Sequence, residues 1–194
     1  MSSVYKSKLL ILKRNDLCRT SRYGWFLRKS MKPGASLTER FDGWFVKPIE
    51  KLKELPEGDG GFLALSAALF LCERYYRAVT DTLNGKRDDE TFKMAAAKDL
   101  GLSLDDFNAF WIVYRNGVQH QGTPKKYIDK KNQLKYFFHI ADEFGGIPEI
   151  CKINAYKREI RLNVWKFADL IIRKFKTNPV VFQKAVSHTF PEVK

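Results

Sequence analysis

Apolar residues recur at spacings of three and four along two long stretches of the chain, which is the spacing of one face of an α-helix. The first stretch covers residues 62–83, and its first half is apolar on almost every side, so we expect it to be buried. The second stretch covers residues 158–175. The repeating positions are Phe62, Leu65, Leu69, Cys72, Tyr76, Val79 and Leu83 in the first, and Ile160, Val164, Phe167, Leu170 and Ile171 in the second. We therefore predict two strong helices over these ranges.

A capping pattern predicts a helix near the start of the chain. Ser36 is followed three positions later by Glu39, which is the spacing of a capping box. The helix would run over residues 37–55, but Gly43 and Pro48 lie inside it, so we expect a break or kink near residue 47. Shorter helices are predicted at residues 89–100 and 180–186.

The pattern changes after Pro124. Residues 127–129 and 134–140 flank the polar run 130–133 and can pair as a hairpin. We therefore predict a mainly α fold, in which a basic N-terminal arm over residues 1–35 precedes a helical domain over residues 36–194. A small β insertion is expected within residues 125–156 of that domain.

The charge of the chain points to polyanion partners. Its 194 residues include 35 Lys and Arg against 22 Asp and Glu, a net charge of +13. Such a balance favours nucleic acid first and an anionic membrane surface second. In the arm, basic residues alternate with aromatic ones, which suits phosphate contacts combined with base stacking. The candidate nucleic-acid-binding residues are Arg19, Arg22, Tyr23, Arg28 and Lys29. The alternative is an arm whose aromatics pack on the body and whose charges are only solvated.

The number and spacing of the cysteines and histidines indicate which kinds of disulfide and metal site the chain can contain. Three widely spaced cysteines fit neither a disulfide framework nor a zinc spacing, which indicates a reducing compartment. The longest apolar run, residues 62–72, is too short to span a bilayer. The three histidines are scattered, and His139 and His188 are interpreted as packed or surface residues. We expect a cytoplasmic protein without a membrane segment, metal or cofactor.

One helix combines a structural pattern with a chemical one. Ser103 can cap a helix over the following residues, whose aromatics are interpreted as core: Phe107, Phe110, Trp111 and Tyr114. The helix ends in Arg115, Asn116 and His120. Arginine offers a fork of donors that suits a phosphate, and histidine exchanges protons near neutral pH. Together they can cleave RNA, with His120 as acid or base, Arg115 stabilising the phosphorane, and Asn116 holding the imidazole or the phosphate.

The spacing of this pair sets a geometric condition. Five residues of a straight α-helix turn through about 140°, so Arg115 and His120 would not share a face. Either Gly117 bends the helix between them, or two copies of a symmetric dimer bring their motifs together.

The segment Arg115-Asn116-x-x-x-His120 resembles the R-x4–6-H motif of the HEPN superfamily (higher eukaryotes and prokaryotes nucleotide-binding). The resemblance covers roughly residues 37–175, with a long apolar helix upstream of the motif. It implies a helical bundle that is usually dimeric. It also implies a metal-independent endoribonuclease of toxin–antitoxin, phage-defence or related conflict systems, with RNA as substrate and an antitoxin or other protein as partner. Arg115, Asn116 and His120 are the catalytic positions that it carries over.

Glu73 and Arg77 are secondary candidates, because the long helix should lie against the motif helix. The alternative for this pair is a solvated ion pair four residues apart. Two further functions remain open. One is a non-catalytic HEPN-like module that binds nucleic acid or a nucleotide, and the other is a helical adaptor with a protein partner.

Overall fold

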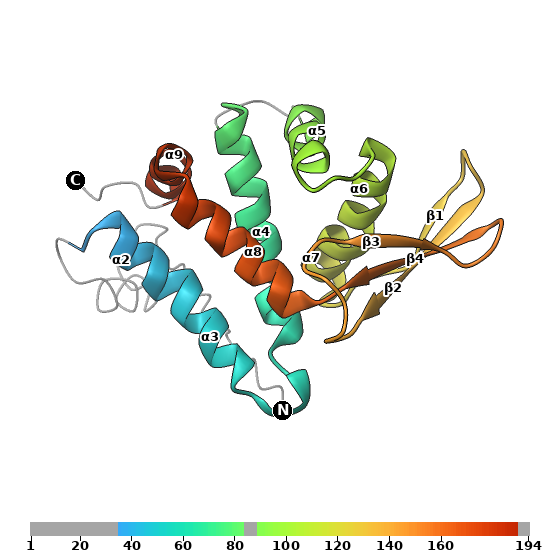
Figure 1. Cartoon of the computed structure of the whole chain (residues 1–194), viewed down its shortest axis with the longest axis horizontal. Coiled ribbons are helices and arrows are strands. Elements are labelled where there is room, and N and C mark those ends of the chain that lie inside the picture. The colour runs from blue at the N-terminus through green and yellow to red at the C-terminus, as the bar shows by residue number, and fades with distance from the viewer. Residues whose placement is uncertain (1–34, 84–88, 190–194) are drawn as a thin grey trace, which may run out of the picture. The chain divides into compact units, whose positions relative to one another are not determined.

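Helices make up most of the structure, and a small four-stranded mixed sheet extends from one side of them (Figure 1). The structure is a computed structural model that describes residues 35–83 and 89–189. The predicted mainly α fold with a small β insertion is confirmed. The five candidate residues of the arm, Arg19, Arg22, Tyr23, Arg28 and Lys29, lie outside the described residues.

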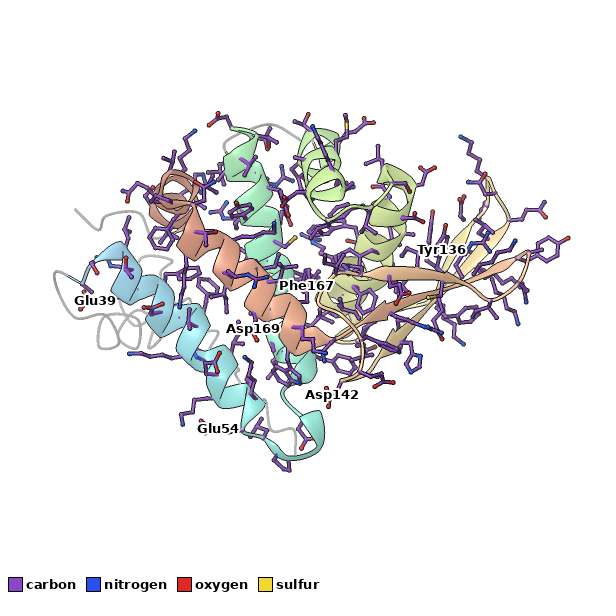
Figure 2. The ribbon with its side chains drawn as sticks, viewed as in Figure 1. Glu39, Glu54, Tyr136, Asp142, Phe167 and Asp169 are labelled. Carbon is purple, nitrogen blue, oxygen red and sulfur yellow. The ribbon has the colours of Figure 1, made fainter. Side chains whose placement is uncertain are left out.

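The long apolar helix predicted from the sequence is α4 (Gly61–Val79), and it lies at the centre of the core. It packs against α5 (Asp89–Asp99), α8 (Val164–Thr177) and α9 (Pro179–Thr189). Leu65, Leu69 and Cys72 are fully buried on it, as the pattern predicts. The expectation that its first half is buried on almost every side is wrong, because Phe62, Leu63 and Phe70 are exposed. The helix ends at Val79, where the Thr80 hydroxyl donates to the Tyr76 carbonyl at 2.9 Å. Figure 2 shows Phe167, on the neighbouring α8, within this core.

The N-terminal helical segment is continuous but irregular directly before residue 47, where the sequence predicts a break or kink. It consists of α2 (Leu37–Phe41), the π-helical turn η1 (Asp42–Val46) and α3 (Lys47–Lys53), followed by the short 3₁₀ turn η2 (Pro56–Gly58). Pro48 lies in the first turn of α3 and has no N–H to donate to the preceding turn. The chain accommodates it with the wider turn η1, and the helix is not broken.

The sheet consists of β1 (Tyr127–Asp129), β2 (Leu134–Ile140), β3 (Glu149–Lys152) and β4 (Lys157–Leu162), in the order β1-β2-β4-β3. The predicted hairpin of residues 127–129 and 134–140 is confirmed as the antiparallel pair β1–β2. β4 pairs in parallel with β2 and antiparallel with β3. Figure 2 shows Tyr136, which is buried on β2.

The prediction that one helix covers residues 158–175 is wrong in its first part. Residues 158–162 belong to β4, and the helix α8 begins at Val164. Ile160 and Leu162 are buried, whereas Glu159 and Arg161 between and beside them are partly exposed, which is the alternation of a strand. Asn163 separates the two elements, and its side chain accepts the Lys166 N–H at 2.9 Å as an N-cap.

Ser103 caps the motif helix as predicted, accepting the Asp106 N–H at 3.1 Å. The helix runs through α6 (Leu104–Phe110), the π-helical turn η3 (Trp111–Asn116) and α7 (Gly117–Gln121). The aromatics interpreted as core are buried: Phe107, Phe110, Trp111 and Tyr114. Across residues 35–83 and 89–189, no helix is long and apolar enough to cross a bilayer.

Candidate functional site

The motif residues lie where the π-helical turn gives way to a regular helix. Arg115 and Asn116 end η3, and His120 lies in the single turn of α7. A π-helical turn has i→i+5 hydrogen bonds and is wider than an α-helical turn, so positions five apart come closer to one face than in a straight α-helix. η3 ends at Asn116, and the step from Arg115 to His120 runs almost wholly through α7, so the π turn does not bring these two side chains onto one face.

Gly117 has right-handed helical backbone angles, φ −60° and ψ −59°, so the helix continues through it without a break. The residue allows close packing: a Cβ on Gly117 would lie 2.6 Å from the Lys125 nitrogen and 2.8 Å from the Pro124 Cα. The segment after the helix folds back at this point, and the Lys125 N–H donates to the Val113 carbonyl at 2.9 Å. The expectation of a bend at Gly117 is therefore corrected: the glycine is needed for the loop to approach the helix.

Arg115 is held by a carboxylate from α4. Its guanidinium donates to Glu73 Oε2 at 3.2 Å and lies 5.9 Å from the centre of the Trp111 ring. The other oxygen of Glu73 accepts from Arg77 Nε at 3.0 Å. Glu73 thus bridges two arginines on different helices. The two secondary candidates, Glu73 and Arg77, are brought together with Arg115, and the pair is not merely a solvated one.

Arg77 is fixed on its far side as well. Its guanidinium donates to Asp89 at the start of α5 and lies 4.4 Å from the centre of the Phe92 ring. Burial alone would lower the pKa of Arg77, but the hydrogen bonds to Asp89 and Glu73 outweigh it and raise the pKa. Arg77 therefore stays charged and rigid at this site.

These side chains line a hollow of about 380 Å³ between α4, α5 and the motif helix. Among the described residues that line it, three guanidinium groups outnumber two carboxylates, so this part of the lining is net positive. Guanidinium forks suit the oxygens of a phosphate. Its lining residues are Phe70, Glu73, Arg74, Arg77, Thr82, Leu83, Asp89 and Arg115.

Arg74 is a member of this hollow that the sequence did not single out. Its Nη2 lies 2.7 Å from His188 Nδ1, and its Nε donates to the Thr189 hydroxyl at 3.3 Å. Burial lowers the pKa of Arg74. No local pattern could reveal the contact with His188, because 114 residues separate the two side chains in the chain.

His120 lies on a different side of the motif helix from Arg115. Its neighbour Gln119 donates to the Ser66 hydroxyl of α4 at 3.1 Å, so Arg115 and Gln119, four residues apart, both face α4. Asn116 and His120 are also four apart and share the next face, on which His120 is exposed. Among the described residues that line the hollow, His120 does not appear. Within a single chain, Arg115 therefore lies with Glu73 and Arg77 at the hollow, whereas His120 lies outside it.

Tyr114, the residue before Arg115, ties the motif helix to the sheet. Its buried hydroxyl donates to the Ile160 carbonyl of β4 at 2.9 Å and lies 3.3 Å from the His139 carbonyl of β2. The loss of solvent raises the pKa of Tyr114, so the hydroxyl keeps its proton. The position of η3 is thereby fixed by the sheet as well as by α4.

His139 lines a second hollow, of about 620 Å³, beside the glycine-rich turn before α4. Its Nδ1 lies 3.4 Å from Glu159 Oε1, and its ring meets Phe144 edge-on at 4.8 Å. The hydrogen bond from Arg161, with a smaller contribution from His139, lowers the pKa of Glu159. These contacts agree with the interpretation of His139 as a packed surface residue.

Within the part of the chain that the structure describes, no three His, Cys, Asp or Glu side chains are grouped so that they could hold a metal ion. No protein family model, curated protein or solved structure matches the chain. The resemblance to the HEPN superfamily therefore rests on the motif Arg115-Asn116-x-x-x-His120 and its helical setting.

Proposed function

We propose that the chain is a HEPN-like, metal-independent endoribonuclease, in which Arg115 binds the scissile phosphate and His120 transfers a proton. The observation that carries the proposal is the guanidinium of Arg115, which Glu73 holds at the wall of a hollow whose described lining is net positive. The same helix exposes His120 one turn later. A fixed cation and an exposed imidazole on one helix are the two groups that RNA cleavage without a metal requires.

The reaction is an attack of the ribose 2′-hydroxyl on the adjacent phosphorus. The O2′–P bond forms and the P–O5′ bond breaks, which leaves a 2′,3′-cyclic phosphate and a 5′-hydroxyl. One imidazole accepts the proton of the 2′-hydroxyl, and an acid gives a proton to the departing O5′. Arg115 stabilises the charge that builds on the non-bridging oxygens of the phosphorane. Asn116, on the same face as His120, orients the imidazole.

A homodimer fits this proposal better than a single chain. Since His120 is exposed on the face next to Arg115, a second copy related by a two-fold axis would bring two Arg115–His120 pairs into one cleft. One His120 then acts as base and the other as acid. A role in a toxin–antitoxin, phage-defence or other conflict system, with a protein partner, rests on the motif alone.

The test measures cleavage of a labelled single-stranded RNA in the presence of EDTA. Arg115→Ala and His120→Ala should each lower the rate by about 100-fold or more while circular dichroism stays unchanged. Arg173→Ala, an exposed arginine on α8, and His139→Ala are the matched controls and should keep the parent rate. Unchanged cleavage by both motif variants would contradict the proposal.

A second candidate function is a non-catalytic module that binds nucleic acid or a nucleotide. The ion pair between Arg115 and Glu73 favours it, because part of the positive charge at the motif is already neutralised. This function predicts salt-sensitive RNA binding without cleavage, and binding that His120→Ala leaves unchanged.

A further inference from the structure

Two turns of the sheet lie at the same end of it. The turn of residues 130–133 precedes β2, and the turn of residues 153–156 precedes β4. β2 and β4 run parallel, with Lys135 opposite Lys157, so both turns must be at the end where these strands begin. The Lys135 N–H donates to the Tyr156 carbonyl at 2.8 Å, which joins the two turns. Figure 1 shows both turns at the end of the sheet that points away from the helices.

This end of the sheet is densely basic, and we call it the lysine tip. It carries Lys130, Lys131, Lys135, Lys152, Lys157 and Arg158. The five lysines are exposed, and none forms an ion pair with any carboxylate that the structure describes. Residues 126–135 and 152–158 contain one acidic residue, Asp129. Its carboxylate accepts hydrogen bonds from the Asn132 side chain at 2.7 Å and from the Lys131 N–H at 2.9 Å.

The lysine tip also presents an aromatic ring. Tyr156 is the last residue of the turn 153–156, and its side chain is 63% exposed. Ile153, the first residue of the same turn, is 54% exposed. The Arg158 guanidinium donates to the Asn154 and Lys157 carbonyls at 2.8 and 3.1 Å, which braces this turn and fixes where Tyr156 emerges. Unpaired lysines beside an exposed ring are the features that bind a phosphate backbone and stack an unpaired base.

We infer that the lysine tip is a docking surface for single-stranded RNA, with the lysines on phosphates and Tyr156 on a base. The choice of RNA among polyanions rests on the proposed function, for which the tip would hold the substrate away from the site of cleavage. Neither the tip nor Tyr156 belongs to the candidate active site, because the hollow at Arg115 is lined by α4, α5 and the motif helix.

The experiment measures the affinity of the full chain for a labelled single-stranded RNA by fluorescence anisotropy, over a series of salt concentrations. All proteins carry His120→Ala, so that the RNA stays intact. The tip variant is Lys130→Ala/Lys131→Ala/Lys157→Ala. The matched control removes three exposed lysines from α3, α5 and α8: Lys47→Ala/Lys98→Ala/Lys176→Ala.

The tip variant should weaken binding by about 10-fold or more and reduce the slope of log K against log salt by about 2, since each phosphate contact on a single strand contributes about 0.7. The control should change the affinity by less than about 3-fold. Tyr156→Ala, which leaves the charge unchanged, should weaken binding by about 5-fold or more without changing the slope.

Three results would overturn the inference: equal losses in the tip and control variants, no RNA binding by the parent, or tip-dependent binding to phosphatidylserine vesicles but not to RNA. Cleavage is assayed separately with His120 intact. Tip-dependent binding without any cleavage would refute the proposed function alone. Cleavage together with binding that ignores the tip would refute this inference alone.

Discussion

The guanidinium of Arg115 donates a hydrogen bond to the Glu73 carboxylate at 3.2 Å, across 42 residues of sequence and between two helices. Glu73 is bonded at the same time to Arg77, so one carboxylate orients two cations. An arginine restrained in this way loses less conformational entropy when it binds a phosphate.

Replacing Glu73 with Ala should destabilise the fold and separate binding from catalysis. The free energy of unfolding should fall by about 1–2 kcal/mol, because Arg77 and Arg115 lose a partly buried partner. If the proposed function is correct, RNA cleavage should show a lower kcat with an unchanged or lower KM, since the positive charge rises while Arg115 is no longer oriented. Urea unfolding and steady-state kinetics measure the two effects.

Glu54→Ala is the control for that change, because Glu54 forms an ion pair with Lys51 in which both side chains are more than half exposed. It should change stability by less than about 1 kcal/mol and leave the kinetics unaffected. An equal loss of kcat in both variants would argue against a positioning role for Glu73.

Replacing Gly117 with Ala should destabilise the protein even though alanine is the better helix former. The added methyl group would meet the backbone of Lys125 and Pro124 at 2.6 and 2.8 Å, and backbone atoms cannot turn aside as a side chain can. The clash should cost about 1–3 kcal/mol. Gly43→Ala is the matched control, because Gly43 is also helical and has nothing within 4 Å of a Cβ. It should stabilise by about 0.5–1 kcal/mol in the same thermal or urea unfolding assay.

Asp99 should make the fold sensitive to acid. Burial alone would raise the pKa of this carboxyl, but hydrogen bonds from Lys174 and from the Tyr76 hydroxyl outweigh burial and lower the pKa. Since the folded pKa lies below the unfolded one, the contribution of Asp99 is fully present above the unfolded pKa and is lost as the pH falls through the folded pKa.

Asp99→Asn should therefore lower stability near neutral pH but lose less stability than the parent protein between about pH 5 and about pH 3. Urea unfolding at each pH gives the comparison. Glu143→Gln, at an exposed loop residue, should keep the parent profile. A parallel loss in the Asn variant and the parent would show that Asp99 does not contribute to the acid transition.

The elements that sequence analysis predicted well are those whose signals are local. The long helix, the Ser103 cap and the hairpin of residues 127–140 all follow from neighbouring residues. Residues 158–162 were misassigned because Ile160, Val164 and Phe167 have helical spacing, although Ile160 and Leu162 also fit a strand. What decides between them is the parallel pairing of β4 with β2, a long-range contact with no sequence signal.

In the candidate site, too, the contacts that follow from local patterns were predicted and a long-range contact was not. Placing Glu73 and Arg77 against the motif helix needed only two amphipathic helices that face each other, and both side chains lie at the hollow with Arg115. The contact between Arg74 and His188 depends on how α9 folds back over α4, which no spacing reveals. The catalytic role of Arg115, Asn116 and His120 remains a prediction.

The hydroxyl of Tyr114 reaches the carbonyls of both Ile160 and His139, so a single phenol spans the seam between β4 and β2. Those two strands lead directly to the lysine tip. Sliding β2 relative to β4 would stretch one of the two contacts of the Tyr114 hydroxyl or displace Tyr114, the residue before Arg115. Tyr114 therefore couples the position of the backbone beside Arg115 to the pairing of β2 with β4.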